Sequence, residues 1–172
     1  MVIWLIGLSG SGKTTLGREI VRLWRRQAPN TVLVDGDEIR RAFRQDMQPA
    51  DYSVEGRRLN ARRILELCAW LDGQQQNVVC SVLSIFPELR AENRTRFRSY
   101  FEVFLNPPLQ TLLQRDTKGL YHKARAGELD NVVGIDIPFP APENPDLEVD
   151  TSESQDVVAM AQHILLQAQG NA

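Results

Sequence analysis

This chain of 172 residues contains few cysteines and has a small net charge. Its two cysteines fall in a helical pattern (Cys68) and in a strand pattern (Cys80), so we interpret both as small buried apolar residues rather than as a disulfide or a redox pair. The formal net charge of −2 creates no overall field that would attract nucleic acid or an acidic membrane. We therefore expect neither as a partner, and a local cluster of residues must bind any anion.

Long hydrophobic runs are also missing. No apolar stretch approaches the ~20 residues of a membrane-spanning helix, and the first residues enter an apolar strand pattern without the basic region and cleavage site of a secretory signal. We therefore expect a cytoplasmic protein. The hydrophobic content of 42% is ordinary for a globular protein, and a chain of this length fits one domain, residues 1–172, with a substantial core.

Apolar runs rich in strand-forming residues alternate with amphipathic helical patterns. Strands are predicted at 2–6, 31–34, 77–82, 101–105 and 147–149, and helices at 13–26, 38–43, 56–71, 87–98, 109–115 and 154–167. A capping box formed by Ser152 and Gln155 is expected to start the last helix. The alternation predicts an α/β fold: a five-stranded, mostly parallel sheet with helices on both faces.

The regular pattern fails over residues 116–146, which we call the lid segment. It contains Lys118 and Lys123, and its second half is dense in proline between residues 138 and 145. A stretch of this length without regular structure inside a compact domain is typical of a lid or a binding loop. We therefore expect the lid segment to cover a ligand site.

Residues 7–14, Gly-Leu-Ser-Gly-Ser-Gly-Lys-Thr, match every fixed position of the phosphate-binding loop (P-loop) and follow an apolar strand pattern. The glycines let consecutive backbone N–H groups converge on phosphate oxygens at the positive end of the next helix. Lys13 supplies a positive charge for the outer phosphates, and Thr14 supplies a hydroxyl for Mg²⁺. The sequence therefore predicts a site for a nucleoside triphosphate at Gly7, Ser9, Gly10, Ser11, Gly12, Lys13, Thr14 and Thr15.

Other sequence features separate the classes of P-loop proteins. The chain contains no Asn-Lys pair, which guanine-specific GTPases use to read the base, and its third predicted strand does not end in the acidic residue of motor-type ATPases. A small-molecule kinase fits better. Asp35 and Asp37 stand at the carboxyl end of the second strand, the edge of an α/β sheet where ligands bind, and one of them could orient an acceptor hydroxyl. Helix capping is the alternative interpretation for either carboxylate.

A basic cluster follows. Arg57, Asn60 and Arg63 recur at spacings of three in one predicted helix, so they share a broad face. A solvated basic face is one interpretation of this pattern. Beside a P-loop, a site for a second anionic ligand is the better one, because arginine clamps bind phosphate or sulfate and position an attacking hydroxyl.

Two further motifs identify a family. Residues 115–128 read RDTKGLYHKARAGE and residues 134–145 read GIDIPFPAPENP, and with the P-loop they resemble the adenylylsulfate kinase (APS kinase) family, whose patterns are approximately RDxKGLYKKARAGE and GIDSPYEAPENP. The resemblance extends from Val2 to about Thr151. It implies a Mg²⁺-dependent P-loop kinase that transfers the γ-phosphoryl group of ATP to the 3′-hydroxyl of adenosine 5′-phosphosulfate (APS). The product serves sulfate assimilation and sulfation. A homodimer is implied in the same way.

The resemblance also implies residue roles. Lys13 and the loop amides hold the ATP phosphates, Thr14 and Asp35 hold Mg²⁺, and Arg115 and Thr151 flank the adenine. Asp37 orients or deprotonates the acceptor hydroxyl, and it forms the catalytic set with Lys13 and with Ser84, which lines the site. The acceptor is bound by Asp35, Asp37, Arg40, Tyr52, Arg57, Asn60, Ser84, Phe86, Lys118, Leu120, Gly134, Ile135 and Phe139. Capping of the following helix is the alternative interpretation for Ser84.

The chain departs from the family pattern on the acceptor side. Residues 84–87 read Ser-Ile-Phe-Pro where the family has Ser-Pro-Tyr-Arg, and Gly56 replaces an aspartate, after about three extra residues. Tyr52 stands where the family has phenylalanine. A kinase for another small anionic acceptor therefore remains an alternative. A catalytically silent nucleotide-binding domain is a third hypothesis, against which the retained Lys13 and Asp37 argue.

Overall fold

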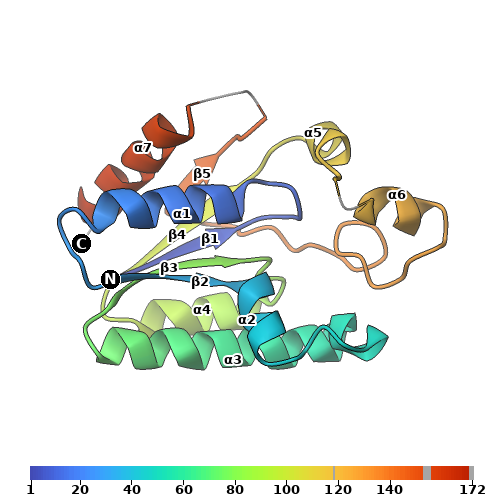
Figure 1. The fold of residues 1–172 in the computed structure, drawn as a ribbon, viewed down its shortest axis with the longest axis horizontal. Coiled ribbons are helices and arrows are strands. Elements are labelled where there is room, and N and C mark those ends of the chain that lie inside the picture. Colours follow the sequence, from blue (N-terminus) through green and yellow to red (C-terminus); the bar gives the residue numbers. More distant parts are fainter. Residues whose placement is uncertain (118, 153–155, 171–172) are drawn as a thin grey trace.

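The computed structural model describes residues 1–117, 119–152 and 156–170. Its centre is a sheet of five strands in the order β2-β3-β1-β4-β5, with each neighbouring pair parallel (Figure 1). The strands are β1 (Val2–Ile6), β2 (Thr31–Asp35), β3 (Asn77–Val82), β4 (Tyr100–Leu105) and β5 (Leu147–Val149). The predicted α/β fold with a parallel sheet is confirmed.

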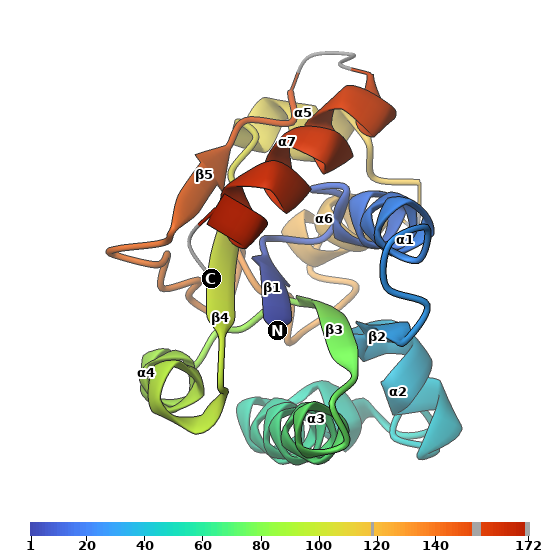
Figure 2. The ribbon, with the colours of Figure 1, turned by 90° about the vertical axis from the view of Figure 1, so that its left-hand side faces the viewer.

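Helices cover both faces of the sheet (Figure 2). On one face lie α1 (Lys13–Trp24) and α7 (Val157–Gly170), and on the other lie α3 (Val54–Gly73) and α4 (Pro87–Arg96). The central strand β1 is apolar along its whole length because both of its faces are buried. Ile3 and Leu5 belong to the core with α1 and α7, whereas Val2, Trp4 and Ile6 belong to the core with α3.

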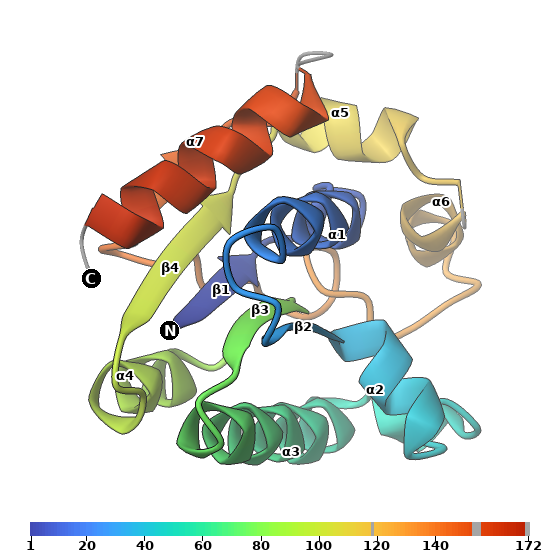
Figure 3. The same ribbon diagram turned by 60° about the vertical axis from the view of Figure 1, so that its left-hand side comes forward.

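The remaining helices gather at one end of the sheet. They are α2 (Gly36–Ala42), the 3₁₀ helix η1 (Pro49–Tyr52), α5 (Leu109–Gln114) and α6 (Leu120–Arg125). Figures 1 and 3 show α2 and α6 as separate helices at the end of the sheet where α1 begins. The P-loop, which joins β1 to α1, lies at this same end.

Several predicted boundaries are wrong by a few residues, and side-chain caps explain two of the shifts. The helix predicted from 38 begins at Gly36, because the Asp35 side chain accepts hydrogen bonds from the amides of Asp37 and Glu38. The helix predicted from 56 begins at Val54, because Ser53 caps it. At the other end of the chain, Gln155 and the predicted start of the last helix lie outside the described residues.

The lid segment contains a helix that the sequence pattern did not predict. The Asp116 carboxylate accepts hydrogen bonds from the amides of Leu120 (2.7 Å) and Tyr121 (2.8 Å), which starts α6 directly after Gly119. Gly119 has a φ of +65°, a left-handed conformation that glycine adopts at low cost. The expectation of an irregular lid is therefore wrong for residues 120–125, while the proline-rich end of the segment forms neither helix nor strand.

Both cysteines are completely buried and neither forms a disulfide, as predicted. Burial is also the main cause of the raised pKa of the Cys80 thiol, so this group is kept in its inert protonated form. Among the residues that the structure describes, no helix combines the length and the apolar character needed to cross a bilayer.

Candidate active site

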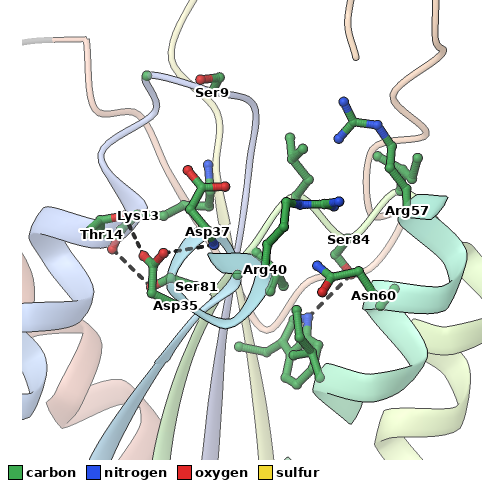
Figure 4. Close-up of a pocket in the computed structure, with 18 of the residues that line it drawn as sticks. Ser9, Lys13, Thr14, Asp35, Asp37, Arg40, Arg57, Asn60, Ser81 and Ser84 are labelled. Atoms are coloured by element: carbon green, nitrogen blue, oxygen red, sulfur yellow. Dashed lines mark hydrogen bonds between the residues drawn. The ribbon is translucent and has the colours of Figure 1, made fainter. Parts of the chain in front are cut away.

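A cavity of about 390 Å³ lies at the carboxyl ends of β1, β2 and β3, between the P-loop, α2 and the first half of α3 (Figure 4). Most of the predicted site residues line it. They are Ser9, Gly10, Gly12, Lys13, Thr14, Thr15, Asp35, Asp37, Arg40, Tyr52, Arg57, Asn60, Ser84, Phe86 and Arg115. The fold thus brings together residues from five separate parts of the chain.

The P-loop forms one wall of this cavity. Gly10 and Gly12 have φ values of +80° and +93°, which residues other than glycine rarely adopt. Gly12 is also the N-cap of α1, a helix of 12 residues, and no side chain caps this end of the helix. Lys13 folds back over the loop, and its Nζ donates to Leu8 O at 2.7 Å and to Ser11 Oγ at 3.3 Å. Backbone amides, a helix N-terminus and an ammonium group together make an anion site.

Thr14 and Asp35 meet beneath the loop. The Thr14 hydroxyl donates to Asp35 Oδ2 at 2.6 Å, and Asp35 Oδ1 caps α2. Asp35 is therefore both a helix cap, which was the alternative interpretation, and a neighbour of the P-loop hydroxyl. Two hard oxygen atoms at this distance fit the ligands that Mg²⁺ takes from proteins, with phosphate and water oxygens completing its shell.

Asp37 lies in the first turn of α2 and is exposed. Figure 4 shows its carboxylate pointing into the cavity, on the side of α2 that faces the P-loop. Because β2 ends at Asp35, both carboxylates leave the sheet at the same edge. The structure therefore separates them into a buried one, 4% exposed, and an exposed one that can reach a ligand in the cavity.

Two arginines form the opposite wall. Arg40 Nη1 donates to the backbone oxygens of Gln45 and Asp51, and its guanidinium lies 4.9 Å from the centroid of the Tyr52 ring. Arg57 donates from Nε to Tyr52 O at 2.8 Å and from Nη2 to Asn131 O at 2.7 Å. Burial and the neighbouring charge of Arg40 lower the pKa of Arg57. An anion between the two guanidinium groups would relieve this repulsion.

Asn60 and Ser84 form the floor of the cavity. Asn60 is 5% exposed and its Oδ1 has no hydrogen-bond partner among the described residues. Ser84 has a φ of +57°, and its hydroxyl accepts a hydrogen bond from Trp4 Nε1 at 3.3 Å. The alternative interpretation of Ser84 as a helix cap is wrong, because Phe86 occupies the N-cap position of α4.

Arg63 from the predicted basic face lies outside the cavity lining, beside the ring of Phe43 at 6.0 Å. On a helix, residues spaced three apart differ in direction by about 60°, so the third residue of the series points away from the site. Only the first two residues of the series, Arg57 and Asn60, line the cavity.

The described part of the lid segment lies largely outside the cavity. Leu120, Gly134, Ile135 and Phe139 were predicted to line the acceptor pocket, but they do not line this cavity. Leu120 packs beside Tyr121, a Cβ at Gly134 would meet Leu8 at 3.2 Å, and Phe139 stacks on Phe104 with ring centroids 6.0 Å apart. Ile135 is 36% exposed, while Lys118 lies outside the described residues. Apolar packing thus holds Leu120 and Phe139 away from the cavity in this structure.

Three predicted ATP-site residues support the loop from behind. Gly7, Ser11 and Thr151 do not line the cavity. A Cβ at Gly7 would lie 2.6 Å from Leu105 O, so glycine is required for the close approach of the loop to β4. Ser11 is fully buried, and Thr151 Oγ1 donates to its carbonyl oxygen at 3.0 Å.

Sequence reasoning missed several residues of the site. Trp4, Ser81 and Tyr121 line the cavity, and all three are buried. Trp4 sits within an apolar strand and looked like an ordinary core residue. Tyr121 belongs to the motif at 115–128, so the motif could have indicated it. Ser81 Oγ donates to Lys13 O at 3.2 Å, and nothing in the strand pattern marked it.

The structure explains the acceptor-side departures. A Cβ at Gly56 would lie 2.5 Å from Ala50 O and 2.6 Å from Asp51 O, so glycine lets η1 pack directly on the start of α3. Phe86 is 6% exposed and packs with Ile137 of the lid segment, under the guanidinium of Arg58 at 4.2 Å. Gly56 thus serves the packing of η1 on α3, and Phe86 serves an apolar contact with the lid segment.

Comparisons with known proteins agree with this geometry. The sequence pattern of the adenylylsulphate kinase family matches residues 1–150. An adenylyl-sulfate kinase of Halothermothrix orenii is 37% identical over 153 residues, which cover 89% of this chain and 81% of the relative. A cytidine diphosphoramidate kinase of Campylobacter jejuni is also 37% identical, over 142 residues covering 83% of this chain and 81% of the relative.

A solved structure is similar over almost its full length. It is an APS kinase of Mycobacterium tuberculosis in complex with AMPPNP and APS, with a TM-score of 0.85, 32% sequence identity, and coverage of 98% of this chain and 96% of the other. The match to the family pattern thus spans the P-loop, the arginine wall and the lid segment. The chain belongs to the adenylylsulphate kinase family.

Proposed function

We propose that this protein is an adenylylsulfate kinase, which transfers the γ-phosphoryl group of ATP to the 3′-hydroxyl of APS. One observation carries the proposal: in a chain of this family, one cavity has a P-loop on one wall and the Arg40–Arg57 pair on the opposite wall. The two walls suit two anionic substrates that face each other. Such an arrangement serves transfer between them.

On the donor side, the amides of the P-loop and the Lys13 ammonium bind the phosphates of ATP. Arg115 lines the cavity and flanks the adenine, and its Nη2 donates at 2.7 Å to the carbonyl oxygen of Thr151, which lies outside the cavity lining. Thr14 and Asp35 would hold Mg²⁺, which when bound neutralises charge on the transferring phosphoryl group.

On the acceptor side, Arg40 and Arg57 hold the phosphosulfate group, and Asn60 and Tyr52 complete the contact. Asp37 stands between the two walls, where it orients the 3′-hydroxyl and accepts its proton. Phosphoryl transfer requires little covalent chemistry from the protein, because its transition state is loose. Positioning of the two anions and neutralisation of their charge are therefore the main contributions of these residues.

A second acceptor deserves a direct comparison. The C. jejuni cytidine diphosphoramidate kinase is as similar to this chain as the H. orenii adenylyl-sulfate kinase, and the departures at Gly56 and Phe86 lie on the acceptor side. Cytidine diphosphoramidate is also an anionic nucleotide that an arginine pair can hold. The retained motifs of the lid segment favour APS.

The test is ADP release from ATP and Mg²⁺, with APS or cytidine diphosphoramidate as the single acceptor. We expect turnover with APS and its loss in Lys13→Ala and Asp37→Ala. Turnover with the cytidine compound alone would replace the first function by the second. A protein that binds no ATP would refute both. The homodimer and the cytoplasmic location stay predictions, which sedimentation and cell fractionation can check.

A further inference from the structure

Two buried hydroxyl groups hold carbonyl oxygens of the P-loop. The Tyr121 hydroxyl, from α6 in the lid segment, donates to Ser9 O at 2.9 Å. The Thr151 hydroxyl, from the segment after β5, donates to Ser11 O at 3.0 Å. Tyr121 is 1% exposed and Thr151 is 6% exposed, so water competes little for either bond.

We propose that Tyr121 and Thr151 are positioning residues that turn the amides of Gly10 and Gly12 toward the phosphates of ATP. The inference rests on the proposed use of ATP as phosphoryl donor. The family resemblance placed Thr151 beside the adenine and gave Tyr121 no role; here both act on the phosphate-binding backbone.

The planarity of the peptide bond supplies the physical link. The carbonyl of Ser9 and the amide N–H of Gly10 belong to one peptide unit, and so do the carbonyl of Ser11 and the N–H of Gly12. In a trans peptide these two groups point in opposite directions, and all described peptide bonds are trans. A hydroxyl that holds each carbonyl therefore also fixes the direction of the corresponding N–H, and Gly10 and Gly12 both line the cavity.

The loop needs such support because glycine gives it unusual freedom. Gly10 and Gly12 both have positive φ, and a glycine loses more conformational entropy on ordering than any other residue. Without external hydrogen bonds, each peptide plane could rotate, and phosphate binding would have to order it. The two hydroxyl groups order the amides before ATP arrives.

Tyr121 is itself held firmly. The Asp116 carboxylate, 3% exposed, accepts hydrogen bonds from the amides of Leu120 and Tyr121 and lies 3.0 Å from His122 Nδ1. Burial and the charge of Asp116 raise the pKa of the Tyr121 hydroxyl to about 12, so it remains a donor at neutral pH. The same lid segment reaches the acceptor wall through Asn131 O, which accepts from Arg57. One segment thus contacts both walls of the cavity.

The test is the affinity of the full chain for ATP without acceptor, measured by calorimetry for Tyr121→Phe and Thr151→Val. Each variant removes one hydroxyl and keeps most of the buried shape. We expect the Kd for ATP to rise about threefold to tenfold in each, the usual effect of one hydrogen bond. The KM for the acceptor should stay within about twofold, because the arginine wall is unchanged.

Tyr100→Phe is the matched control. It also removes a phenol hydroxyl, partly buried, which donates to Glu102 Oε2 at 2.7 Å, but Tyr100 lies outside the cavity lining. This variant should lower the melting temperature and leave the affinity for ATP unchanged. A merely structural role for Tyr121 would make both tyrosine variants behave alike.

Wild-type affinity for ATP in both Tyr121→Phe and Thr151→Val would overturn the inference while the proposed function stands. If Tyr121→Phe does not fold, Thr151→Val alone decides, since it acts on the second peptide unit. Failure of the wild-type protein to bind ATP would instead refute the proposed function, so the two failures are distinguishable.

Discussion

The two walls of the cavity are built in different ways. The donor wall comes from one continuous stretch, the P-loop and the start of α1, which lines the cavity at Ser9, Gly10 and residues 12–15. The acceptor wall is assembled from α2, η1, α3 and the lid segment. Arg40 donates to the backbone oxygen of Asp51, and Arg57 donates to that of Asn131, 74 residues along the chain. A contiguous backbone motif tolerates little change, whereas a wall made of side chains from several elements can be altered piece by piece. The departures from the family pattern accordingly lie on the acceptor wall.

The largest effect is expected where the two walls meet. Asp37→Asn removes the carboxylate that accepts the acceptor proton, and we expect kcat to fall about 10²- to 10⁴-fold, the range for general bases. The Kd for ATP should change little, because Asp37 is not part of the P-loop. Single-turnover kinetics measures the chemical step. An unchanged kcat would remove Asp37 from the catalytic set.

The next largest effect is expected for the acceptor wall alone. Arg57→Lys keeps the charge but loses the two hydrogen bonds to Tyr52 O and Asn131 O and the planar fork for an anion. We expect the KM for the acceptor to rise about 10- to 100-fold, as for hydrogen bonds to charged groups. The KM for ATP should remain unchanged in steady-state kinetics.

Arg63→Lys is the control for that prediction, because Arg63 shares the helix with Arg57 and lies outside the cavity lining. Its acceptor KM should equal that of the wild type. Equal effects of the two substitutions would mean that the arginines act through general surface charge, and the comparison between the walls would fail.

A smaller effect probes the packing behind the acceptor wall. Gly56→Ala places a Cβ about 2.5 Å from backbone oxygens of η1, and such overpacking costs about 1–3 kcal/mol of the free energy of unfolding. Gly73→Ala on the same helix meets nothing within 4 Å and should stabilise the protein slightly. Urea denaturation measures both. A stable Gly56→Ala variant would show that η1 moves freely against α3.

The smallest effect concerns acid stability of the lid segment. Burial opposes ionisation of Asp116, but hydrogen bonds from His122 and from backbone amides outweigh it and lower the pKa of this carboxyl below its ordinary value of 3.8. A carboxyl whose pKa is lower in the folded state stabilises the protein fully at pH values above its unfolded-state pKa. This contribution disappears as the pH falls through the folded-state pKa. Melting temperatures between about pH 2 and 6 should therefore fall less steeply for Asp116→Asn than for the wild type. Parallel curves would exclude this contribution.

Local patterns predicted most of the fold. The strands were predicted to within one residue, because apolar runs bounded by turns report burial directly. Helix starts were less accurate, since caps such as Asp35 and Ser53 lie outside the periodic pattern. Helix α6 was missed because its start depends on the Asp116 side chain rather than on hydrophobic periodicity.

The sequence by itself determined the donor wall, because its residues are neighbours in the chain and a P-loop needs only a strand, glycines and a helix N-terminus. Only the tertiary structure decided which side chains complete the site. Arg57 meets Asn131 across 74 residues, Trp4 meets Ser84 across 80, and Tyr121 meets Ser9 across 112. Such contacts depend on how parallel strands bring distant turns to one edge of the sheet, and no local pattern encodes that distance.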